Sequence, residues 1–316
     1  MELEELCSSS RVIIVAGKGG VGKTTVTAAL ATAATRAGRT ALVVELEGKS
    51  GLAATFGRPN LEDREFAPFP GLQVLPIAPD EALVEYLEGH GLGRISKRLM
   101  STGAIDVVST AVPGMKDILV LGKVKALQRE RAADVIIVDG PAAGHAVTFL
   151  LSPKGLLDAV RVGPVLTQAM EVTEMLTDPD RARVMLVTLP EETPVNETVE
   201  TAGVLMDVAG LSLAPLVVNG LYPDRTLDTD PERIRALAAA AGVPVTDTEI
   251  DHLALAAEFH TRRRALQTGQ LERLEATLDL PQVRLPFLFS ADLGPPQLEV
   301  LADALTAGLG AVATAP

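Results

Sequence analysis

Nine consecutive residues near the N-terminus combine glycines, lysines and threonines in an order that suits phosphate binding. They are Gly17-Lys18-Gly19-Gly20-Val21-Gly22-Lys23-Thr24-Thr25, and they fit the pattern G-x-x-x-x-G-K-[ST]. Glycines allow a tight turn whose N–H groups converge on phosphate oxygens. In this pattern Lys23 lies between the β- and γ-phosphates and the Thr24 hydroxyl holds a magnesium ion. The segment predicts binding of ATP or ADP with Mg²⁺.

The alternative for this segment is a structural glycine turn without a ligand. Its position argues against that alternative, because an apolar run precedes it and an Ala-rich stretch over Thr24–Arg36 follows it. A helix that begins at the end of the loop would add its positive N-terminal dipole to the phosphate site.

Acidic residues at the ends of two apolar runs are candidates for the rest of the site. Asp139 follows Val135–Val138, where an acid holds a magnesium-bound water in this class of site. Glu45 and Glu47 end another run, and strand alternation would place them on one face near the loop. One of the two can orient the attacking water; the alternative is that both are solvated strand-end acids.

Apolar, β-branched runs alternate with helical stretches along the whole chain, which predicts an α/β fold with a mostly parallel sheet covered by helices. The expected strands are Val12–Ala16, Thr40–Leu46, Leu72–Ile77, Val135–Val138, Arg183–Leu189, Pro215–Asn219 and Val283–Leu288. Two intervals are too long for simple crossovers. We therefore expect a single domain over 1–316 with a helical subdomain inserted in two pieces, about 79–133 and 152–181.

Composition narrows the function further. The 316 residues are 47% hydrophobic and carry a formal net charge of −13, which disfavours nucleic-acid binding. Arg262–Arg264 form the densest basic run, and we interpret it as a solvated helix face. The single cysteine, Cys7, and a polar N-terminus suit a cytoplasmic protein. No apolar run reaches the length of a membrane span, so we do not expect an integral membrane protein.

Lys18 makes the loop the deviant form G-K-G-G-x-G-K-T, and the chain resembles the arsenical-pump and tail-anchored-protein targeting ATPase family over about 11–305. Further matching stretches are Asp139–His145, Val187–Thr198, Val217–Gly220, Leu285–Leu288 with Ser290–Pro296, and Pro113–Met115. The resemblance implies a dimer in which Lys18 reaches the partner's nucleotide, as an arginine finger does. It also implies that Asn219 reads the adenine edge and that Pro286 belongs to a loop over the adenine.

The chain departs from the family at several residues. Glu47 replaces the water-orienting Asp; its extra methylene is about 1.5 Å long, and a shift of about 1 Å can cost roughly 100-fold in rate. Gly140 and Ala143 stand where the switch loop of the family has threonines. His145, in the same loop, we interpret as structural. Cys7 alone supplies neither the zinc-binding C-x-x-C pair of targeting members nor a three-thiol arsenite site.

The predicted function is an ATP-dependent dimeric switch ATPase that handles a hydrophobic protein client or a membrane partner, as a homodimer or with a paralogue. Because Glu47 and Gly140 depart from the family pattern, a second hypothesis is a nucleotide-binding regulatory or chaperone subunit with little hydrolysis. A division-site positioning ATPase would need a membrane-targeting helix or a DNA-binding patch, and we find neither. The apolar residues of the helical insertion, including Met170 and Met175, fit a subdomain core or a client groove.

Overall fold

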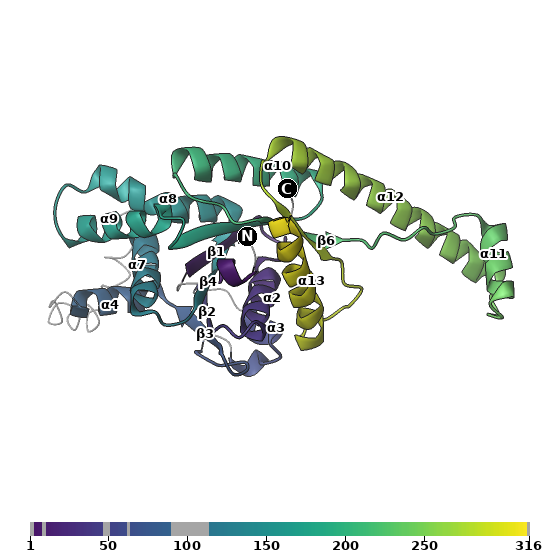
Figure 1. Cartoon of the computed structure of the whole chain (residues 1–316), viewed down its shortest axis with the longest axis horizontal. Helices are drawn as coiled ribbons and strands as arrows, with labels where there is room; N and C mark the ends of the chain where they lie inside the picture. The colour runs from purple at the N-terminus through teal and green to yellow at the C-terminus, as the bar shows by residue number, and fades with distance from the viewer. Residues whose placement is uncertain (1–2, 8–10, 47–50, 62–63, 90–113, 315–316) are drawn as a thin grey trace.

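The computed structural model describes residues 3–7, 11–46, 51–61, 64–89 and 114–314. Its centre is a parallel sheet with the strand order β3-β2-β4-β1-β5-β6-β7 (Figure 1). The strands are β1 (Arg11–Gly17), β2 (Ala41–Leu46), β3 (Leu72–Ile77), β4 (Val135–Ala142), β5 (Ala182–Thr188), β6 (Leu216–Leu221) and β7 (Gln282–Pro286). The predicted α/β fold with a parallel sheet is confirmed.

The helices are α1 (Leu3–Leu6), α2 (Lys23–Arg36), α3 (Leu52–Thr55), α4 (Pro79–Gly89), α7 (Met115–Glu130), α8 (Ala143–Ala159), α9 (Pro164–Thr177), α10 (Glu192–Gly203), α11 (Pro231–Ala240), α12 (Asp247–Thr277) and α13 (Pro295–Thr314). Short turns of other helix types cover Pro59–Leu61 (η1) and Val204–Val208 (η2).

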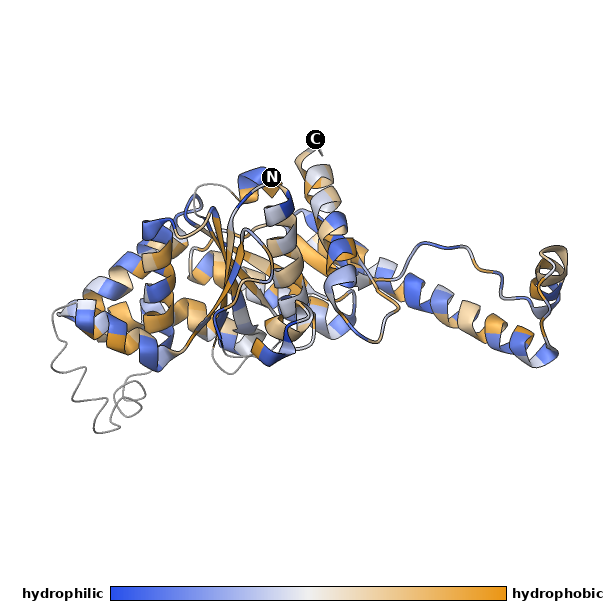
Figure 2. Ribbon diagram, turned by 90° about the horizontal axis from the view of Figure 1, so that it is seen from below, coloured by the Kyte–Doolittle hydropathy of each residue, from blue (hydrophilic) through white to orange (hydrophobic). Residues whose placement is uncertain are grey.

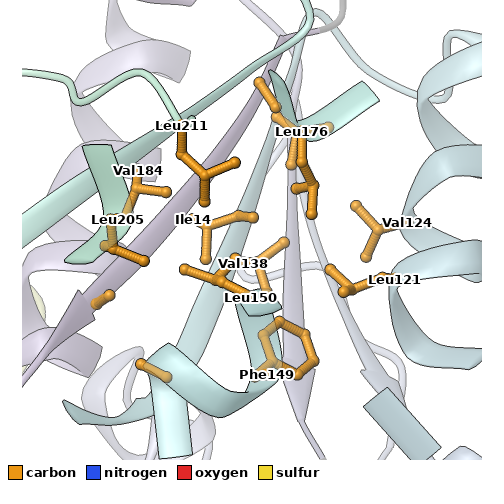
Figure 3. Packing of buried hydrophobic residues seen from close by; sticks show 14 of the residues in the cluster. Ile14, Leu121, Val124, Val138, Phe149, Leu150, Leu176, Val184, Leu205 and Leu211 are labelled. Atoms are coloured by element: carbon orange, nitrogen blue, oxygen red, sulfur yellow. The ribbon is translucent and has the colours of Figure 1, made fainter. Parts of the chain in front are cut away.

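Alternating residues of the central strand β1 face two separate cores. Val12 and Ile14 belong to a core shared with α7, α8 and α9, whereas Ile13 and Val15 belong to one shared with α2 and α13. Every residue of β1 is buried, as expected for a parallel strand covered on both faces. Figure 3 shows Ile14 and neighbouring strand residues facing side chains of α7, α8 and α9.

The helices α4, α7, α8 and α9 pack on one another at one end of the molecule (Figure 1). Their shared apolar residues continue into the core on that side of the sheet. Leu121 and Met175 are fully buried there, whereas Val162 and Met170 are exposed. These helices are the basis for our proposal of a helical subdomain within 79–133 and 152–181, of which residues 90–113 lie outside the described part of the chain.

The opposite end of the molecule is a projecting arm made by α11 and the first half of α12 (Figures 1 and 2). The helix α12 has 31 residues. It starts with a capping box, in which the Thr246 side chain and the Glu249 side chain each bond the other's backbone N–H. No residue of α11 is buried. The arm therefore contributes little to the core of this chain.

Candidate nucleotide site

The glycine-rich loop joins the central strand β1 to the buried helix α2. The backbone of Gly22, at φ 92°, lies in the left-handed region just before α2 starts at Lys23. A Cβ at Gly17 would lie 2.2 Å from the carbonyl oxygen of Val187, so only glycine fits between β1 and β5. The loop has the strand–loop–helix placement that a phosphate-binding loop requires.

Thr24 and Asp139, the two predicted metal-binding residues, lie next to each other. The Thr24 Oγ1 donates a hydrogen bond of 2.8 Å to Asp139 Oδ2, although the residues are 115 positions apart. Asp139 is completely buried on β4, the neighbour of β1 in the sheet. A hydroxyl and a carboxylate are oxygen ligands of the kind that Mg²⁺ prefers, so the pair fits a magnesium ion.

Both lysines of the loop are held by groups of their own chain. The Lys23 Nζ donates to the Lys18 carbonyl oxygen over 2.9 Å, which closes the loop on itself. The Lys18 Nζ lies 2.6 Å from Glu197 Oε1 on α10. The contact between Glu197 and Lys18 could not be predicted from the sequence, because it follows from the packing of α10 and not from a local pattern.

The acidic end of β2 is only partly within the described residues. Glu47 lies outside them, so its role as the residue that orients water stays a prediction. Glu45 is 2% exposed and lies opposite Asp139 in the β2–β4 register. Its Oε1 accepts bonds of 3.3 Å from the N–H groups of Gly51 and Leu52, and thereby holds the start of α3. Glu45 is therefore a buried acceptor rather than a solvated acid.

Asn219 and Pro286 occupy the ends of the neighbouring strands β6 and β7. The Asn219 Nδ2 donates to the Val21 carbonyl oxygen over 2.9 Å, so Asn219 directly contacts the phosphate-binding loop. Pro286 pairs in register with Leu221 and lines a cavity of about 510 Å³. The structure brings Asn219 to the site, and contact of both residues with adenine stays a prediction.

The switch loop, Asp139–His145, runs from the end of β4 into α8. Gly140 follows Asp139, and a Cβ there would lie 2.4 Å from the Val15 carbonyl oxygen. His145 is exposed on α8. Burial raises the pKa of Asp117 on α7, and the charge of His145 lowers that pKa in part. His145 therefore lies close enough to act electrostatically on α7.

Arg262–Arg264 lie at the surface of α12 with none of them buried, as expected, but they do not share one face. Arg262 is exposed and pairs with Glu258, but Arg263 pairs with Glu191 and Arg264 faces Asp224. Successive residues of a helix are about 100° apart, so three in a row cannot share one face.

The comparisons with known proteins agree with this geometry. A family model described as "Anion-transporting ATPase" matches residues 10–162, which include the glycine-rich loop and Asp139. "ATPase BagA" of Mycobacterium tuberculosis is 32% identical over 310 residues, covering 91% of this chain and 90% of the relative. The chain belongs to the anion-transporting ATPase family. It is a nucleotide-binding ATPase of this family.

Other members of the anion-transporting ATPase family are similar over much of the chain. "ATPase GET3" of Chaetomium globosum is 25% identical and covers 94% of this chain and 90% of its own length. "Putative arsenical pump-driving ATPase 1" of Aquifex aeolicus is 26% identical and covers 70% of this chain and 65% of its own. Within the described ranges, no helix is both long enough and apolar enough to span a membrane.

Proposed function

We propose that this protein hydrolyses ATP to ADP and phosphate with Mg²⁺, as a two-subunit switch. The observation that supports this most is the Thr24–Asp139 hydrogen bond, which places both predicted metal-binding oxygens at the start of α2. Bound Mg²⁺ would neutralise charge on the β- and γ-phosphates. Thr24 and Asp139 would hold the ion, and Lys23 with the loop N–H groups would hold the phosphates.

Completion of the site by a second subunit is the next part of the proposal. Lys18 is about one-third exposed, at 35%, so its ammonium group lies at the surface and not within its own core. A cation that arrives from a second subunit would stabilise negative charge that grows on the phosphates during hydrolysis. The partner would be an identical chain or a paralogue.

The output of the switch would be handling of a hydrophobic protein client or a membrane partner. The exposed Val162 and Met170 on the helical end of the molecule support an apolar partner there. Arsenite is a poor candidate, because it binds thiolates and the chain has one cysteine. Burial raises the pKa of that residue, Cys7, to about 12, so it stays a thiol.

A specific observation supports the second candidate, a nucleotide-binding regulatory or chaperone subunit with little hydrolysis. The Gly140 backbone lies so close to β1 that a threonine side chain would meet the Val15 carbonyl. The hydroxyl group that the resemblance places at this position is therefore both absent and sterically excluded. Slow hydrolysis would follow if that hydroxyl stabilised the reaction.

Single-turnover hydrolysis by the wild type, Lys18→Ala and Lys23→Ala tests both candidates. An ATPase completed by Lys18 should lose about 100- to 1,000-fold in rate when this one cation is removed. A wild-type rate no higher than that of Lys23→Ala would favour the binding subunit. Equal rates and equal dimerisation for the wild type and Lys18→Ala would exclude action of Lys18 on the nucleotide of a second subunit.

A further inference from the structure

The Lys18 ammonium group is bonded to its own chain. Its Nζ lies 2.6 Å from Glu197 Oε1, and the side chains of both residues are about one-third exposed, at 35% and 37%. A charge-assisted bond of this length is shorter and stronger than a neutral one. A Cβ at the adjacent Gly19 would meet nothing within 4 Å, so the chain around Lys18 has open space on that side.

The helix α10, which carries Glu197, is also bonded to the second half of α12. Asn196 Oδ1 accepts a hydrogen bond from Arg273 of α12. Glu191, which immediately precedes α10, pairs with Arg263, which is also on α12. The start of α10 is thus fixed between the phosphate-binding loop and α12. Glu197 consequently has a defined place, and Lys18 meets a positioned carboxylate rather than a freely moving one.

We propose that Glu197 is a positioning residue that holds Lys18 on its own subunit and limits its transfer to the nucleotide of a second subunit. This rests on the proposed function of Lys18. In this proposal, the reach of Lys18 toward phosphates in another chain draws its ammonium group away from Glu197. Loss of the Glu197 bond is therefore part of the cost of closing the dimer, and removing the carboxylate should favour closure.

The first experiment needs no nucleotide. Acylation of Lys18 by a water-soluble amine-reactive ester is followed by mass spectrometry in the wild type, Glu197→Gln and Glu200→Gln. Glu200 is exposed on the same helix, so its substitution removes an equal charge as a matched control. Part-exposed pairs contribute up to about 1 kcal/mol, so we expect Lys18 to react about 2- to 5-fold faster in Glu197→Gln. The Glu200→Gln rate should equal that of the wild type.

The second experiment measures dimer formation by sedimentation with a slowly hydrolysed ATP analogue. Glu197→Gln should tighten the dimer about 2- to 5-fold. The double variant Lys18→Ala/Glu197→Gln should assemble no more tightly than Lys18→Ala alone, because the restraint acts only through Lys18.

The outcomes separate the two proposals. If Lys18→Ala assembles and hydrolyses ATP as the wild type does, the proposal that Lys18 acts on the nucleotide of a second subunit is wrong. If Lys18→Ala is impaired but Glu197→Gln leaves acylation unchanged, or weakens the dimer, the restraint by Glu197 fails alone. If no variant dimerises with itself, the acylation rates still decide whether Glu197 restrains Lys18.

Discussion

Position 22 favours glycine for two reasons, a left-handed backbone and a close neighbouring side chain. Its φ is 92°, and a Cβ there would lie 2.4 Å from Asn219 Nδ2. We predict that Gly22→Ala destabilises the fold by about 1–2 kcal/mol through backbone strain and, by displacing Asn219, weakens nucleotide binding about 10-fold or more. Chemical unfolding and titration with a fluorescent ATP analogue measure the two effects.

The matched control for this prediction is Gly38→Ala. Gly38 also has a left-handed backbone, at φ 78°, but a Cβ there meets nothing within 4 Å. It should show a similar loss of stability with unchanged nucleotide affinity. Unchanged affinity in Gly22→Ala as well would mean that contact between Gly22 and Asn219 does not matter for binding.

Cys7 gives a pH prediction. Burial raises its pKa from 9.0 to about 12, against smaller opposing effects of Arg39 and Arg11. Above pH 9 the unfolded chain has lost the thiol proton that the folded chain retains, so stability falls as pH rises toward 12 and is unaffected below 9. The slope from this group is at most about 1.4 kcal/mol per pH unit.

Urea unfolding of the wild type and Cys7→Ala between pH 8 and 10.5 measures this slope. The variant should be less stable at pH 8, because it loses buried volume, but its stability should fall less steeply with pH. Parallel curves would show that the thiol does not titrate differently in the two states.

Some residues of the site could be predicted from the sequence and others could not. Lys23, Thr24 and Asp139 were predicted, because a fixed spacing and the position at a strand end define them. The partner of Lys18 was not, because Glu197 is 179 residues away and its approach depends on how α10 packs. The capping box at Thr246 and Glu249 is a local pattern that could have located the start of α12.

At the scale of elements, a buried side-chain amide hydrogen-bonds α12 to the end of β6. The Gln267 side chain is completely buried; its Nε2 donates to the Gly220 carbonyl and its Oε1 accepts from the Tyr222 N–H, both over 3.0 Å. Gln267→Ala would leave two backbone groups at the end of β6 without these partners. Each such group costs about 1–3 kcal/mol, so we expect a loss of about 2–4 kcal/mol in unfolding free energy.

The neighbouring Leu266 provides the control, because it is 67% exposed on the same helix. Leu266→Ala should change the unfolding free energy by less than about 0.5 kcal/mol. A loss in Gln267→Ala no larger than that in Leu266→Ala would show that the amide does not anchor α12. Urea unfolding of both variants decides between these results.

All seven strands of the described sheet were predicted from sequence. The central strands are buried on both faces and apolar at nearly every position, and the partly exposed edge strands β3 and β7 still contain alternating buried apolar residues. The arm was not predicted. Its helices mix polar and apolar positions (Figure 2), and whether a helix of that kind packs on the body or projects from it depends on tertiary contacts.

For the whole molecule, the arm presents apolar side chains that its own core does not cover. They are Leu237, Val243, Leu253, Leu255 and Phe259, each about half exposed or more. Exposed apolar groups gathered on one part of a molecule are typical of association surfaces. Together with the surface position of Lys18, they agree with the proposed two-subunit assembly.

Complementation between two inactive variants tests this assembly directly. Lys18→Ala keeps its own phosphate-binding Lys23, whereas Lys23→Ala keeps the Lys18 that a partner would need. In a mixed pair, the site of the Lys18→Ala chain receives Lys18 from the Lys23→Ala chain and is complete. We expect an equal mixture to recover about a quarter of the wild-type rate per chain, since half of random pairs are mixed and each carries one complete site.

The control for complementation is a mixture of Lys23→Ala with the double variant Lys18→Ala/Lys23→Ala, in which no pairing yields a complete site. Its rate should equal that of the single variants. Recovery should also rise with total protein concentration, since it depends on pairing. If Lys18 instead acts only on the nucleotide of its own chain, every mixture stays inactive, because no chain in it has both lysines.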